Sequence, residues 1–167
     1  MTLNLNELNK GGTQCFSKAG LVISSTPANY GVVNPQGAGI EYAINGAMYY
    51  IADTADQAMT AAAAQGLLTS CIYLVAATTS GTFVTVKGTG VLNADLTAGN
   101  AVLRCPEPAI NTCPIGMICV QTLVGGNFTA GTTALTPAAT LAVTYIDLTL
   151  LPAMPFASFP TTAVITL

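Results

Sequence analysis

The side chains that could do chemistry are few, and none of them is a histidine. The chain of 167 residues holds seven carboxylates and five cysteines. General acid–base catalysis most often uses a histidine that titrates near neutral pH, and the common serine and cysteine triads contain one. No spacing among the carboxylates selects two of them as a glycosidase pair. The sequence therefore predicts that the protein is not an enzyme. The carboxylates are Glu7, Glu41, Asp53, Asp56, Asp95, Glu107 and Asp147.

Asp53 and Asp56 have a structural explanation, because they flank a predicted helix start. The residues from Thr54 to Gln57 match a capping box, in which hydroxyl and amide side chains satisfy free backbone N–H groups. An alanine-rich stretch and then a glycine follow, which favour a helix and its end. We expect one short α-helix over about 54–65, with both aspartates near the positive end of its dipole.

The cysteines are predicted to be reduced. Their number is odd, no Cys-x-x-Cys pair occurs, and the N-terminus does not resemble a secretory signal. Zinc sites use closely spaced Cys and His ligands, and these spacings fit poorly. We expect small buried apolar side chains; a Cys105–Cys113 disulfide across a loop is the alternative. No cofactor and no metal is predicted. The cysteines are Cys15, Cys71, Cys105, Cys113 and Cys119.

The composition indicates a folded protein whose surface is largely covered. Charged residues make up 7% of the chain, against about 25% in an average globular protein. The mean hydropathy of +0.60 is unlike that of a disordered chain. A free monomer ordinarily carries more surface charge to stay soluble. We therefore expect much of the surface to pack against copies of the chain or against a partner protein.

Nucleic acid and membrane are both excluded as expected partners. The net charge is −3, and the four cationic residues are scattered along the chain, so no row of phosphates would be neutralised. The stretch 58–77 is uncharged, but Gln65-Gly66 interrupts it and its two halves differ in character. A membrane span needs about 20 mainly apolar residues, and we expect none here.

The strongest local signal is a β-hairpin around Asn45-Gly46. This dipeptide tolerates the positive φ angles of a type I′ turn, and apolar residues flank it on both sides. Tyr42 is predicted to pack across the hairpin against Tyr49 or Tyr50. A sugar-binding platform made of these three tyrosines is the alternative.

Further strands predict a mainly β fold, a small antiparallel β-sandwich or barrel. The apolar run 71–77 is typical of a strand buried on both faces. Turn clusters at 97–100, 125–127 and 129–132 separate the strands. The other expected strands lie at 19–25, 82–87, 101–104, 115–122 and 141–149.

Three parts of the chain are expected: a flexible N-terminal arm at 1–12, one β-rich domain at 13–149, and an extended apolar tail at 150–167. The tail contains three prolines, which block helix and interior strand. It lies along its own domain or docks on a neighbour, and its exposed apolar character favours the neighbour. The predicted partner-binding residues are Leu3, Leu5, Leu8, Leu151, Met154, Phe156 and Phe159.

Three stretches carry a resemblance to a known class of protein. They run from Ile44 to Thr54, from Cys113 to Thr122, and from Asn127 to Leu135, the last closing on the strand Leu141-Ala-Val-Thr-Tyr. Together they make up about a fifth of the chain and resemble small virion structural proteins of tailed bacteriophages.

The resemblance implies a head decoration, or cement, protein that sits as a homotrimer on the capsid surface and clamps neighbouring major capsid protein subunits. Such a protein is made in the bacterial host cytoplasm. Another virion component (a head fibre, tail tube or baseplate protein) is the second expectation, and a sugar- or cell-surface-binding module is the third.

Overall fold

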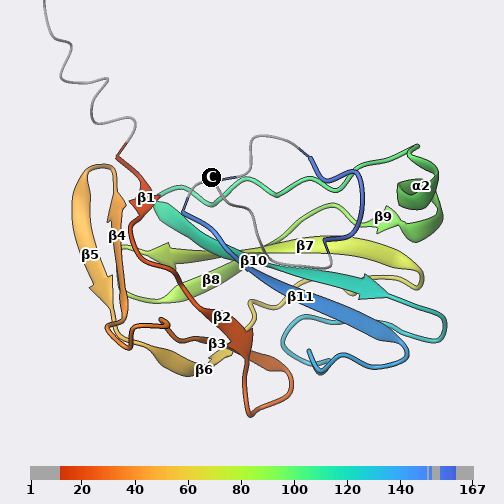
Figure 1. The fold of residues 1–167 in the computed structure, drawn as a ribbon, viewed down its shortest axis with the longest axis horizontal. Helices are drawn as coiled ribbons and strands as arrows, with labels where there is room; N and C mark the ends of the chain where they lie inside the picture. The colour runs from red at the N-terminus through yellow and green to blue at the C-terminus, as the bar shows by residue number, and fades with distance from the viewer. Residues whose placement is uncertain (1–11, 150, 152–154, 161–167) are drawn as a thin grey trace, which may run out of the picture.

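The computed structural model describes residues 12–149, 151 and 155–160. Within these ranges the protein is mainly β, as predicted, with three antiparallel sheets and one six-residue helix (Figure 1). No helix in the described ranges has the length and hydropathy of a membrane span. The elements are β1 (Gln14–Cys15), β2 (Leu21–Ile23), β3 (Asn29–Val32), β4 (Ile40–Ile44), β5 (Ala47–Ile51), β6 (Thr54–Ala58), β7 (Thr69–Thr78), β8 (Phe83–Lys87), β9 (Val91–Leu92), α2 (Asn93–Ala98), β10 (Thr112–Thr122) and β11 (Leu141–Asp147).

A five-stranded sheet forms the centre, with the order β11-β10-β7-β8 and β9 paired to β7. The prediction of a strand buried on both faces at 71–77 is confirmed in β7. Because side chains alternate along a strand, Cys71 and Tyr73 enter one apolar core and Ile72 and Leu74 enter another. The long sheet therefore has a core on each face.

A β-bulge in β10 preserves this division. The register shifts between Pro114 and Gly116, and an interior proline is tolerated at such a point. Before the bulge Ile115 faces the first core, and after it Ile118 does so, so the alternation changes by one residue. Gly116 is required here, since a Cβ would overlap the side chain of Leu21 and lie 2.8 Å from a backbone oxygen.

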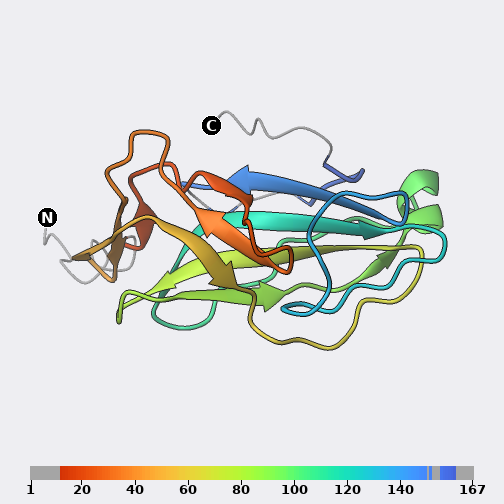
Figure 2. The same ribbon diagram turned by 90° about the horizontal axis from the view of Figure 1, so that it is seen from below.

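Two small sheets, ordered β1-β4-β5 and β2-β3-β6, contribute to the first core, and Figure 2 shows them against the long sheet. The predicted hairpin is confirmed: Asn45 and Gly46 have φ of 52° and 82°. Tyr42 pairs with Tyr49 across it, and their rings stack with centroids 5.6 Å apart. The expected strand at 19–25 is present as β2.

The second core is closed by α2 and by two irregular segments. Leu96 of α2, Leu103 and Phe156 all pack in it. The predicted strand at 101–104 is wrong, because only Leu103 pairs there, through a single bridge to Phe156. The turn predicted at 97–100 contains the end of α2, where Gly99 adopts φ 74° and caps the helix.

The helix predicted over 54–65 is also wrong. Residues 54–58 form β6, which pairs with β3, and the alanine-rich residues that follow run without helix beside β8. The ammonium of Lys87 donates hydrogen bonds to the carbonyls of Ala63 and Ala64 at 2.6 and 3.3 Å. The intrinsic helix preference of a residue is worth only about 0.5 kcal/mol. Strand pairing and these contacts outweigh it.

Candidate interaction surface

The carboxylates that were predicted to start a helix instead hold loops together. Asp53 accepts a hydrogen bond from the N–H of Asn34 at 2.9 Å. Asp56 accepts bonds from the hydroxyl of Ser24 at 2.7 Å and the amide of Asn29 at 2.9 Å. These hydrogen bonds hold the pKa of Asp56 below its ordinary value. Within the described ranges, no three His, Cys, Asp or Glu side chains gather in a way that could hold a metal ion.

The five cysteines are free thiols, as predicted, and no bridge joins Cys105 to Cys113. Four are buried and Cys105 is half-buried. Burial raises the pKa of Cys71 and Cys105 to about 11 and that of Cys113 and Cys119 to about 12. Because the thiolate is the reactive form, the raised pKa values disfavour reactive thiolates at neutral pH. The four buried thiols pack in the interior.

Large apolar side chains remain exposed over several parts of the described surface. The most exposed are Ile110 at 91% and Val124 at 79%. Charged residues are scarce around them because the chain has so few. Exposed apolar patches mark contact surfaces more often than isolated residues do. The full set is Phe16, Val22, Ile23, Val33, Met48, Tyr50, Leu67, Leu68, Leu92, Ile110, Val124 and Leu151.

An apolar pocket of about 290 Å³ lies beside the points where both terminal segments leave the described ranges. Thr13 lines it from the N-terminal side, and Thr149 and Leu151 line it from the C-terminal side. Two prolines, Pro108 and Pro114, also line it. Leu151 is 39% exposed, so this predicted partner-binding residue is accessible at a surface hollow of suitable chemistry.

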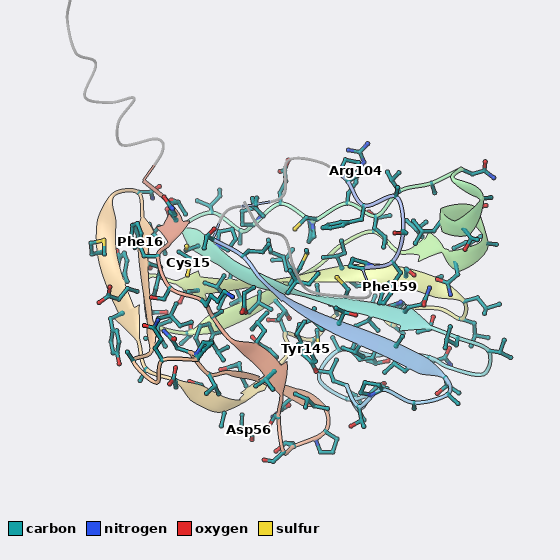
Figure 3. All side chains as sticks on the ribbon, viewed as in Figure 1. Cys15, Phe16, Asp56, Arg104, Tyr145 and Phe159 are labelled. Carbon is teal, nitrogen blue, oxygen red and sulfur yellow. The ribbon has the colours of Figure 1, made fainter. Side chains whose placement is uncertain are left out.

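Two other predicted partner-binding residues, Phe156 and Phe159, contact their own domain. Both are half-buried and pack against the second core, and Figure 3 shows Phe159 over the long sheet. The backbone of Phe156 exchanges two hydrogen bonds with Leu103, at 2.7 and 2.9 Å. This part of the tail therefore follows the alternative in which it lies along its own domain. Leu3, Leu5, Leu8 and Met154 lie outside the described residues.

Sequence reasoning missed the exposure of β5. Its side chains Met48 and Tyr50 are 62% and 60% exposed, and the strand lies at the edge of its sheet. Tyr42 is fully buried, so the three tyrosines of the hairpin do not share one exposed platform. The hairpin itself was predictable, but its edge position depends on strand order.

Comparisons of the chain with protein-family models, with curated proteins and with solved structures find no match. The functional argument consequently depends on the residues and surfaces described above. Of these, the pocket beside Leu151 is lined both by Thr13, near the start of the described chain, and by Thr149 and Leu151, where the predicted tail begins.

Proposed function

We propose that the chain is a virion structural protein of a tailed bacteriophage, which decorates and stabilises the capsid by binding neighbouring major capsid subunits. In this proposal it assembles as a homotrimer on the capsid surface after synthesis in the bacterial host cytoplasm. The resemblance of three sequence stretches to small virion proteins supports the phage origin. The observation that supports the docking role is the apolar pocket lined by Thr13, Thr149 and Leu151.

The physical basis of attachment is burial of this uncharged surface. Apolar area removed from water contributes about 25 cal/mol per Å² before the costs of association are subtracted. The described residues that line the pocket are two prolines, two threonines and Leu151, none of which is charged, so removing them from water costs little. Many copies bound to one shell would then act together through multivalency.

The test is co-sedimentation of the purified full chain with expanded empty capsids assembled from the major capsid protein of the same phage. We expect saturable binding, with a fixed number of chains per capsid subunit. Leu151→Asp should weaken binding at least tenfold, because a carboxylate would enter the apolar contact.

Leu92→Asp is the matched control. Leu92 is also exposed, at 52%, but belongs to β9 next to α2 and is not part of the pocket. It should bind as the unmodified chain does. Absence of capsid binding by the unmodified chain, together with binding to purified tails or baseplates, would replace decoration by the second virion role.

A further inference from the structure

The edge strand β5 differs from the other described edge strands of five or more residues, because it contains no charged residue, proline or bulge. Natural edge strands are commonly protected by charged residues, prolines or bulges. Among the described edge strands of five or more residues, β6 contains Asp56, β8 contains Lys87 and β11 contains Asp147. The sequence of β5 is Ala-Met-Tyr-Tyr-Ile, and its register with β4 is regular.

The register shows which backbone groups of β5 face outward. Ile44 and Ala47 close a two-residue turn, so this pair is hydrogen-bonded and the bonded pairs then alternate along the hairpin. Tyr49 and Ile51 are bonded to β4 in the same way. The N–H and C=O groups of Met48 and Tyr50 therefore point to the free side, where no strand of the described chain lies.

The same two residues carry the exposed side chains. Met48 and Tyr50 lie on one face of β5, since they are two residues apart. The ring of Tyr50 lies over Gly39, where a Cβ would be 2.7 Å from the tyrosine oxygen. The glycine thus leaves space for the ring, which stays open on its outer side and is 60% exposed.

We propose that β5 pairs with β5 of a second copy of this chain, antiparallel about a two-fold axis at Tyr49. In this register Met48 of each copy lies opposite Tyr50 of the other. The outward backbone groups then form four hydrogen bonds, two in each pair. Methionine sulfur and an aromatic ring also attract one another. It is the register that pairs all five residues of both strands.

The charges of β4 and β5 do not oppose a second copy as the occupant. Glu41 is the charged residue of β4, and it pairs with Tyr50 on the exposed face. Across the two-fold axis the row reads Glu41, Tyr50, Met48 of the second copy and Ala43 of the second copy. The two Glu41 side chains therefore lie in different rows, and no like charges face each other although each chain has a net charge of −3.

The contact area indicates a weak association. The exposed parts of the two side chains amount to on the order of 100 Å² each, and a stable dimer buries about 800 Å² per partner. We expect dimers at high micromolar concentration in solution and greater occupancy where copies are held close together. The inference concerns only copies of this chain and is independent of capsid binding. Under the proposed function it would join copies from adjacent trimers.

Sedimentation velocity of the full chain from about 10 μM to 1 mM gives the first test. We expect a monomer–dimer equilibrium, or self-association beyond the trimer if trimers form. Met48→Lys should raise the dissociation constant of this step at least tenfold, because it introduces a charge at the edge. Val124→Lys, at a residue that is 79% exposed and distant in sequence, should leave it unchanged. Equal effects of both variants, or no association at 1 mM, would refute the proposal.

Cross-linking tests the register. Paired residues in adjacent antiparallel strands have Cα atoms about 5.5 Å apart, within disulfide range. A mixture of Met48→Cys and Tyr50→Cys chains should form several times more cross-linked dimer than either variant alone, against the oxidised unmodified chain as background. Preferential cross-linking of Met48→Cys to Leu5→Cys would instead show that the N-terminal segment occupies the edge, and would overturn the proposal.

Discussion

Thr60 and Thr85 exchange two hydrogen bonds between side chain and backbone. The N–H of Thr60 donates to the hydroxyl oxygen of Thr85 at 2.8 Å, and the N–H of Thr85 donates to the hydroxyl oxygen of Thr60 at 2.9 Å. This reciprocal pair joins the alanine-rich segment to the outer edge of β8. These bonds satisfy the N–H groups of Thr60 and Thr85, which would otherwise need a neighbouring strand as a partner.

Thr85→Val should lower the free energy of unfolding by about 1–2 kcal/mol, because it leaves the N–H of Thr60 without its acceptor at nearly constant side-chain shape. Thr85 is buried, with 7% exposure. Urea unfolding followed by circular dichroism measures the change. Thr79→Val serves as the control, since Thr79 is exposed in the turn that precedes β8. Equal stability of the two variants would contradict the role given to the pair.

Gly116→Ala should destabilise the protein by about 2 kcal/mol, the usual cost of overpacking a tight site. The added Cβ would meet Leu21 and the carbonyl oxygen of Ile146 at the bulge. Gly90→Ala is the matched control, because no atom lies within 4 Å of the corresponding Cβ. Thermal unfolding of both variants compares them directly. A melting temperature for Gly116→Ala equal to that of the control would show that the bulge is not close-packed.

The protein should lose stability as the pH rises above about 9. Burial raises the pKa of Cys119 and Tyr145 to about 12 in the folded state, above their ordinary values of 9.0 and 10.0. The unfolded chain therefore releases protons first, and alkaline pH favours it. The urea midpoint should be constant between about pH 7 and 8 and should fall steadily toward pH 10.5.

Cys119→Ala removes one of these groups, so the urea midpoint should fall less steeply at alkaline pH. The part of the fall that comes from the tyrosines should remain.

Alkylation of the thiols provides a second measurement. At pH 8, alkylation of the buried Cys71, Cys113 and Cys119 should be at least about 100-fold slower in the folded protein than in urea, because their raised pKa values of about 11 to 12 lower the thiolate fraction by that much. Rapid labelling of these three buried thiols in the folded state would contradict the prediction.

Phe156→Ala should release the described part of the tail from the second core, with a loss of about 2 kcal/mol for a half-buried phenylalanine. Limited proteolysis should then cleave near residues 155–160 at least tenfold faster. Phe16→Ala is the control, as Phe16 is 52% exposed and belongs to no core. Unchanged cleavage would mean that the backbone bonds to Leu103 alone retain the segment.

The sequence was sufficient for elements whose signal is local. The turn at Asn45-Gly46 requires positive φ angles, and the structure has them. The apolar run of β7 predicts burial on both faces whatever its neighbours are. The helix at 54–65 failed because its capping box and alanines describe an isolated segment, whereas β3 and Thr85 offer that segment partners distant in sequence.

The helix α2 was missed for the opposite reason. Its N-cap is Leu92, which makes no side-chain capping bond, so the usual start signal is absent. Only part of the candidate interaction surface could be predicted from the sequence. An apolar C-terminal segment pointed to Leu151, but the pocket beside it needs the loop at Pro108 and the bulge at Pro114, which no local pattern brings together.

The pairing of β7 with β10 also affects folding during synthesis, because β7 leaves the ribosome before β10 has been made. Their register joins Cys71 to Val120 and Ala77 to Cys113, so the first strand is synthesised long before its partner exists. Contacts between such distant residues form slowly. Until β10 is made, one edge of β7, an uncharged and aggregation-prone strand, has no partner in the nascent chain. We expect its yield in cells to depend on chaperones that hold this strand until β10 is complete.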